Sequence, residues 1–285
     1  MWDLKTIKRF LVHLSSIFSF RSLILSAAAV IATLFCMKKG WVADYPMALI
    51  GTAVIFPIVF SINSAYHRRE EALAHYARIK ANLRSIYFTL CGWQNKKIIG
   101  SIEDLQTCLA KPLFALRDVI TVSSDNLRDN EPAIYKSFSI IAEMIEFRAI
   151  ECDVDGAEKS ACRNYLNTVM VETEELKHIF QYRTPRALQA FSDVFITILP
   201  ILYGPVFASI ALSIDNYTLA FLVPALFAFV LSSLDNIQAD LEDPFDGIGV
   251  DDMVVNAEVF HASLRNHTAQ SDAGRDSMAM LNPAE

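Results

Sequence analysis

Four long apolar stretches alternate with polar segments along the 285-residue chain. They run over Ser22–Met37, Tyr45–Tyr66, Ala187–Ile214 and Asn216–Leu234, and the third contains one charge, Asp193. About 20 apolar residues suffice to cross a bilayer as a helix, so the first stretch, at 16 residues, needs help from its flanks. Only the sequence SIDNY separates the last two stretches, which predicts a helical hairpin.

The polar segment 67–186 also has helical periodicity. Apolar residues recur near helical spacing in its first part, at Leu73, Ala77, Ala81, Ile86 and Leu90. The segments 133–151 and 157–180 repeat the pattern, and no strand-like alternation of any length occurs. We therefore predict an all-α membrane protein in which four transmembrane helices continue into long cytoplasmic helices.

The composition agrees with a membrane protein and argues against a nucleic-acid partner. The chain is 53% hydrophobic with a mean hydropathy of +0.31, which is too apolar for an ordinary soluble domain. Its net charge of −7 does not suit nucleic acid, which needs basic patches. The five cysteines form no C-x-x-C pair, so we interpret them as free thiols facing a reducing compartment or as core residues.

The distribution of charge predicts the orientation of the chain. The N-terminal segment carries four cations, Lys5, Lys8, Arg9 and Arg21, whereas the loop at 213–217 has only Asp215. The positive-inside rule then places both termini and the segment 67–186 in the cytoplasm. The predicted organisation has five parts: 1–66 with two transmembrane helices, 67–186 as a cytoplasmic helical region, 187–234 as the hairpin, 235–265 as an acidic segment, and 266–285 as a disordered tail.

No catalytic motif is present in the sequence. It lacks a nucleophile elbow, a Walker loop, a dinucleotide-binding fingerprint and H-E-x-x-H, and its six histidines lie at no ligand spacing. Two groups of carboxylates, Glu70 with Glu71 and Glu172 with Glu174 and Glu175, have no acid or base partner nearby in sequence. We interpret them as solvated helix faces and do not predict an enzyme.

The second apolar stretch has an unusual face. Thr52, Phe56 and Phe60 are spaced i, i+4, i+8, and Asn63 and His67 nearly continue that line. The periodicity by itself favours packing of both phenylalanines against a neighbouring helix. However, polar residues at membrane depth usually face a protein interior or water rather than lipid.

An acidic segment follows the last apolar stretch. Seven carboxylates lie between Asp235 and Asp252. Oxygen-rich loops of this kind bind Ca²⁺, but the glycines at 247 and 249 do not match an EF-hand, and a solvated acidic turn is the alternative.

Three motifs give the chain a resemblance to a known family. The sequence INSAYHRREEA at 62–72 resembles the signature of the bestrophin family, in which an Asn-containing helix end leads through Tyr-x-Arg to Glu-Ala. NIQADLEDPFDG at 236–247 resembles the family's acidic Pro-Phe motif, and YRTPRALQAF at 182–191 is similar to its bacterial and plastid branch. The likeness covers roughly residues 5–262. Arg69 and Glu70 replace the aromatic pair that often follows the signature arginine.

The resemblance implies a homopentamer in the lipid bilayer with an axial pore that passively conducts small monovalent anions, among them chloride and bicarbonate. Its narrow neck would be lined by three residues of the second helix, here Thr52, Phe56 and Phe60. Rings of phenylalanine form hydrophobic constrictions that gate by dewetting. The pore mouth would carry Asn63, His67, Arg68 and Arg69.

The resemblance also implies a cytoplasmic constriction, for which Thr184 is the candidate, and a calcium clasp after Pro-Phe. In this chain the clasp is interrupted and leaves Asp246, Asp251 and Asp252, so we expect Ca²⁺ gating to be weak or absent. Three alternatives remain open: a cation-selective channel, a non-conducting membrane scaffold, and a membrane-bound enzyme that uses the carboxylate clusters.

Overall fold

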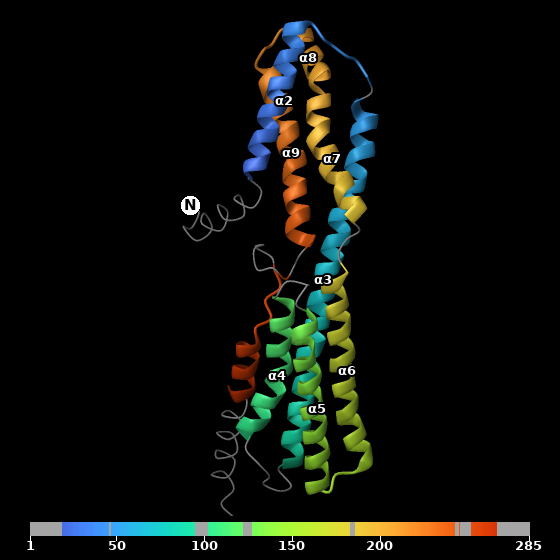
Figure 1. The fold of residues 1–285 in the computed structure, drawn as a ribbon, viewed down its shortest axis with the longest axis vertical. Helices are drawn as coiled ribbons and strands as arrows, with labels where there is room; N and C mark the ends of the chain where they lie inside the picture. Colours follow the sequence, from blue (N-terminus) through green and yellow to red (C-terminus); the bar gives the residue numbers. More distant parts are fainter. Residues whose placement is uncertain are drawn as a thin grey trace, which may run out of the picture. The chain divides into compact units, whose positions relative to one another are not determined.

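The structure is a computed structural model of the chain, and it describes residues 19–45, 47–94, 102–121, 127–182, 186–242, 245 and 252–266. Every regular element within these residues is a helix (Figure 1). Four helical segments are long and apolar enough to cross a membrane: Phe20–Lys39, Ile50–Trp93, Ala190–Ser213 and Leu219–Glu242. The prediction of an all-α membrane protein with four transmembrane helices is confirmed.

The chain divides into two compact units. Unit 1 consists of Met1–Glu70 and Arg183–Asp252, and unit 2 of Glu71–Tyr182 and Met253–Glu285. The long helix α3, Met47–Gln94, begins in unit 1 and ends in unit 2.

Unit 1 contains α2 (Phe20–Lys39), the first part of α3, α7 (Arg186–Leu202), α8 (Gly204–Ser213) and α9 (Leu219–Glu242). Helix α2 packs on α7, α8 and α9, and α7 packs on α9. Apolar residues from all five helices meet in one core. Its members are Leu25, Val54, Ile58, Ile196, Leu199, Tyr203, Val206, Phe207 and Leu231.

Helix α2 has strong stop and start signals. Ser19 caps its N-terminus, because the Ser19 hydroxyl accepts a hydrogen bond from the Ser22 amide at 3.2 Å. Gly40 ends it at φ 66°, a left-handed conformation that a residue without Cβ adopts at little cost. These caps extend the predicted stretch Ser22–Met37 to a helix of 20 residues, which is long enough to span.

The third predicted span is not one continuous helix. It breaks at Tyr203 into α7 and α8, since Pro205 in the first turn of α8 has no amide hydrogen with which to continue the ladder of α7. At the break α8 lies close to α2: a Cβ added to Gly204 would come within 3.2 Å of the carbonyl carbon of Ala32. A side chain at this crossing would therefore push α8 and α2 slightly apart, and glycine allows the closer approach.

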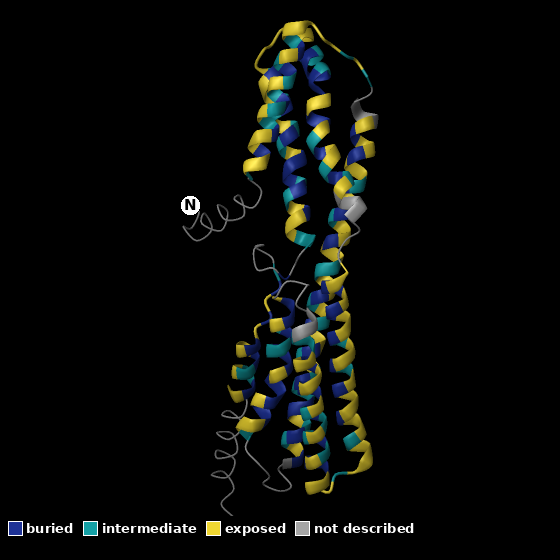
Figure 2. Ribbon diagram, viewed as in Figure 1, coloured by how far each residue is buried: buried dark blue, intermediate teal, exposed yellow. Residues whose placement is uncertain are grey.

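Unit 2 is a helical bundle. It contains the second part of α3, α4 (Ile102–Ile120), α5 (Leu127–Glu151), α6 (Gly156–Gln181) and a short helix over residues 257–266. Helix α5 packs on both α4 and α6. Figure 2 shows buried and exposed residues alternating along these helices, as expected when each presents one apolar face to the bundle.

The apolar stripe in the second part of α3 differs from the predicted one. Ala77 and Ala81 are exposed and Leu73 is half-buried. The buried stripe runs through Ala72, Tyr76, Ile79, Leu83, Ile86, Leu90 and Trp93, and Tyr87 beside it is also buried. Their steps of three and four follow the 3.6-residue turn, whereas repeated steps of four drift around the helix. Tyr76 joins the stripe because its hydroxyl accepts a hydrogen bond from the Asn256 amide at 3.1 Å.

The five cysteines are all free thiols. Cys36, Cys108, Cys152 and Cys162 are buried, and Cys91 is half-buried. Burial raises the pKa of Cys162 to about 12, which keeps this thiol protonated and unreactive at neutral pH. Four of the five therefore act as core residues.

Candidate functional site

The first part of α3 has one covered face. Val54, Ile58, Ser61 and Ala65 are buried, and Ile58 and Ala65 have no exposed surface. Val54 and Ile58 belong to the core of unit 1, where they meet Ile196 and Leu199 of α7. These buried residues attach α3 to the core of unit 1. Their helical spacing determines which residues of α3 lie on the opposite face.

The opposite face of α3 is open in the single chain. Thr52, Phe56 and Phe60 are all exposed, with 61% of Phe56 and 56% of Phe60 accessible. The two phenylalanine rings contact each other edge to face, with centroids 4.6 Å apart and planes at 81°. More than half of each residue is uncovered, so no second helix of the described part of the chain packs over the two rings. The periodicity by itself had favoured such packing.

A proline lies between the two rings in sequence. Pro57 is half-buried inside α3, and the helix continues through it. A proline removes one backbone hydrogen bond from the helix interior. The effect of Pro57 is therefore on the hydrogen bonding of the helix backbone.

The charged end of the open face follows directly. Asn63 and His67 are exposed, and Arg68 and Arg69 are half-buried. The Arg69 guanidinium donates to Glu70 Oε1 at 2.8 Å, so the positive charge of Arg69 is compensated by its neighbour in sequence. The residues predicted for the neck and the mouth thus lie along one helix, from Thr52 to Arg69.

A second charged cluster in unit 1 was not recognised from the sequence. Arg21 at the start of α2 donates to Asp235 of α9 at 2.7 Å and to Asp193 of α7 at 3.2 Å. It also lies 3.3 Å from the Thr197 hydroxyl. Asp235 is buried and Asp193 is half-exposed. One arginine therefore joins three membrane helices, and the only signal in the sequence was isolated charges at the edges of apolar stretches.

Beside this cluster, hydroxyl groups connect α2 to α9. The Ser232 hydroxyl donates to that of Ser22 at 3.0 Å, and both residues are buried. The Asn236 amide also reaches the Ser22 oxygen, at 3.4 Å. Such contacts between membrane helices satisfy polar groups that lipid does not. They are positioned to hold helices together rather than to bind a ligand.

Two glutamates of α6 form ion pairs. Glu172 accepts from His75 at 2.6 Å and from Arg78 at 3.4 Å, and its side chain is only 13% exposed. Glu174 pairs with Lys177 at 3.1 Å. The interpretation of these carboxylates as a solvated face is therefore wrong for Glu172, which neutralises cations of α3. Glu174 and Glu175 are exposed, as are Glu70 and Glu71.

Lys177 is the most deeply buried charge of this group. Its side chain is 3% exposed, and its ammonium group contacts Glu131, Tyr135 and Glu174. Burial by itself lowers the pKa of Lys177, but the hydrogen bonds to these three partners outweigh it and raise the pKa. The lysine stays charged and ties α6 to α5.

Several predicted site residues lie outside the described part of the chain. Thr184, the candidate for the cytoplasmic constriction, is one of them, and so are Asp246 and Asp251. Asp252 is described and half-buried. Among the described residues, no three His, Cys, Asp or Glu side chains are grouped so as to hold a metal ion. The Ca²⁺ prediction therefore stays a prediction.

The chain was compared with known proteins. No family model and no curated protein matches its sequence. Solved structures do match: a bacterial bestrophin homologue from Klebsiella pneumoniae has a TM-score of 0.69 at 17% identity, over 88% of this chain and 98% of that one. Two single-substitution variants of that homologue give TM-scores of 0.68 and 0.69 at 18% identity, covering 87% and 90% of this chain and 98% of theirs.

This likeness extends over both units and the helices that carry the open face. Because the sequence identity is low, the likeness shows a shared arrangement of helices and does not show a shared chemical function. The motifs at 62–72 and 236–247 agree with it independently. The chain is an integral membrane protein with the fold of the bacterial bestrophin homologues.

Proposed function

We propose that this protein is an ion channel of the bestrophin type and not an enzyme. Five copies would surround an axial pore that passively conducts chloride, bicarbonate and other small monovalent anions. The observation that carries the proposal is the open face of α3. A membrane helix places two phenylalanines on a face that the described rest of the chain leaves uncovered, while Val54 and Ile58 on its other face pack into the core of unit 1.

The chemistry of this face suits a neck. Ten phenylalanine side chains from five copies of Phe56 and Phe60 would form apolar rings that resist a continuous water column. Ring edges carry a positive partial charge, so aromatic side chains presented edge-on tolerate an anion without a fixed cation. Thr52 would form the outermost ring.

The residues after the neck suit an anion vestibule. His67 and Arg68 would concentrate anions where the pore widens, and Arg69 contributes less because Glu70 compensates its charge. Unit 2 and both termini would lie in the cytoplasm, where Thr184 would form the second constriction. Asp246, Asp251 and Asp252 would provide at most a weak Ca²⁺ site.

The decisive measurement is a reversal potential. Purified protein is reconstituted in a planar bilayer with asymmetric potassium chloride, and the zero-current voltage is recorded. A value near the chloride equilibrium potential supports an anion channel. A value near the potassium potential would mean a cation channel, which the net charge of −7 makes the main competitor. Absence of current from folded protein would favour the scaffold or enzyme alternatives.

A further inference from the structure

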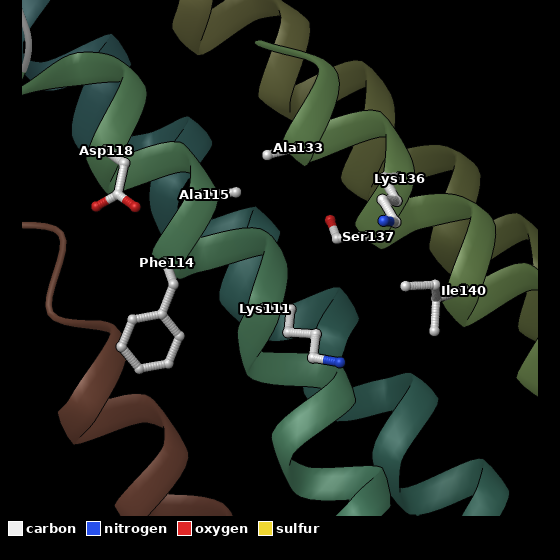
Figure 3. A pocket seen from close by; sticks show the side chains of 8 residues that line it. All are labelled: Lys111, Phe114, Ala115, Asp118, Ala133, Lys136, Ser137 and Ile140. Carbon is white, nitrogen blue, oxygen red and sulfur yellow. The ribbon is translucent and has the colours of Figure 1, made fainter. Parts of the chain in front are cut away.

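Unit 2 contains a pocket that the proposed channel does not use. It lies between α4 and α5, and its volume is 440 Å³, within the range of small-molecule sites. Figure 3 shows the eight side chains that line it: Lys111, Phe114, Ala115, Asp118, Ala133, Lys136, Ser137 and Ile140.

The pocket exists because small side chains occur where the two helices run together. Ala115 of α4 and Ala133 of α5 contribute only a methyl group each (Figure 3). Phe114 and Ile140, both half-buried, add apolar surface to the walls. Ser137 is buried, and its hydroxyl donates to the Ile134 carbonyl, so this hydrogen is already used. Most of the wall is therefore apolar.

Two lysines supply the charge of the pocket. Lys111 extends from α4 and Lys136 from α5, and both are exposed (Figure 3). Neither makes a salt bridge within the described part of the chain, unlike Lys159 and Lys177 of α6. The one carboxylate of the pocket, Asp118, lies 3.7 Å from the guanidinium of Arg117. Two lysines that make no salt bridge within the described residues, against one aspartate, leave this apolar pocket with a net positive charge in a protein whose own net charge is −7.

We propose that this pocket binds a small amphiphilic anion. Its carboxylate or other anionic head would contact the ammonium groups of Lys111 and Lys136, and its apolar body would lie against Ala115, Ala133 and Ile140. The ligand is a water-soluble molecule rather than a bilayer lipid, because α4 and α5 are not among the helices apolar enough to span a membrane. A purely inorganic anion would leave the apolar wall uncovered.

Octanoate is a suitable probe, because it carries a carboxylate on a short apolar chain. It is titrated calorimetrically into the full-length protein in lipid nanodiscs, and the titration into empty nanodiscs is subtracted to remove partitioning into lipid. We expect saturable binding of one octanoate per chain. Acetate, which has the head alone, and n-octanol, which has the body alone, should each bind at least about tenfold more weakly.

Two variants test the two halves of the site. The double change Lys111→Gln and Lys136→Gln removes both charges and should weaken octanoate binding about tenfold without changing the weak affinity for octanol. Ala133→Leu fills the space at an exposed position and should abolish binding of both. The control Lys39→Gln removes an exposed charge in unit 1 and should change neither.

Ala133→Leu could weaken binding by perturbing the bundle, so the lysine variant is the decisive one. Both lysines are exposed, and their replacement should leave the melting temperature unchanged. No saturable octanoate binding by the unaltered protein would overturn the proposal. The same conclusion would follow if the lysine variant bound octanoate as tightly as the unaltered protein, or if octanol bound as tightly as octanoate. These results concern unit 2 alone, so they do not depend on whether the protein conducts ions.

Discussion

At the scale of single residues, exposure distinguishes the two faces of α3. Phe56 and Phe60 are more than half accessible, whereas Ile58, between them in sequence, has no exposed surface. Substitution to alanine removes the same kind of apolar surface in both cases. Only the buried site leaves a cavity in the chain's own core, so the same chemical change has different consequences on the two faces.

The double change Phe56→Ala and Phe60→Ala tests the proposed neck. If the rings restrict a pore, their removal should raise the current through reconstituted channels several-fold and leave the melting temperature nearly unchanged. The measurement is macroscopic current together with thermal denaturation. Lower current with a large fall in melting temperature would mean that the two rings pack against protein and do not line a pore.

Ile58→Ala is the matched control on the same helix. It should lower the free energy of unfolding by about 2–5 kcal/mol, because it leaves a cavity among the core residues of unit 1. It should not increase the current. A gain of current in this variant as large as in the double variant would show that loosening α3, rather than opening a neck, increases conduction.

Arg21 is the second residue with a defined prediction. Arg21→Gln leaves the buried carboxylate of Asp235 without its cation, and we expect a loss of about 2 kcal/mol, between the values for exposed and for buried ion pairs. Asp193→Asn removes a half-exposed partner and should cost less than about 1 kcal/mol. Thermal denaturation in nanodiscs measures both. If both variants lost the same free energy of unfolding, the pair between Arg21 and Asp235 would not be the main contribution of Arg21.

At the scale of elements, the helix at 257–266 is part of unit 2. Ala257, Phe260 and Leu264 are buried, and the Leu264 carbonyl accepts from the Tyr87 hydroxyl at 3.4 Å. On the exposed side Glu258 pairs with Arg117 of α4 at 2.6 Å. The sequence predicted a single acidic segment over 235–265. Its last part is instead a helix that contributes to the core of the bundle.

Phe260→Ala should destabilise unit 2 by about 3–5 kcal/mol, because the ring is 2% exposed. Glu258→Gln should have a small effect that depends on pH. Hydrogen bonding to Arg117 lowers the pKa of Glu258, so its contribution is present above the ordinary value of 4.5 and is lost as the pH falls below it.

The melting temperatures of the unaltered protein and of the Glu258→Gln variant should therefore converge in acid. A difference that is constant across pH 4.5 would show that the ion pair does not stabilise the docked helix. The Phe260→Ala loss, by contrast, should persist at every pH at which the unaltered protein is folded, since no titratable group is removed.

At the scale of the whole molecule, a pore between subunits requires assembly. The open face of α3 belongs to a single chain, and an axial neck forms only when copies of it surround a common axis. We expect light scattering in detergent, after subtraction of the detergent mass, to give five times the subunit mass of 31.9 kDa. A particle of one subunit mass would exclude an axial pore, whatever the chemistry of Phe56 and Phe60.

Much of this fold was predictable from the sequence because its signals are local. About twenty consecutive apolar residues require a helix in a bilayer, and a 3.6-residue period requires a helix with one buried face. The four spans and the helices of the described residues between 67 and 182 follow from these two rules. The spacing of Thr52, Phe56 and Phe60 likewise places these three residues on a single helix face, because residues four apart lie one above the other.

The tertiary structure decided which surfaces and charges meet. The partners of Arg21 lie 172 and 214 residues away, and no local pattern indicates that they converge. Glu172 looked solvated because its cations, His75 and Arg78, come from α3, about a hundred residues away in sequence. Whether the phenylalanine face was covered also depended on where α7 packs. Periodicity is a property of neighbouring residues, whereas contact and burial depend on how distant segments fold together, so only the assembled helices could settle these points.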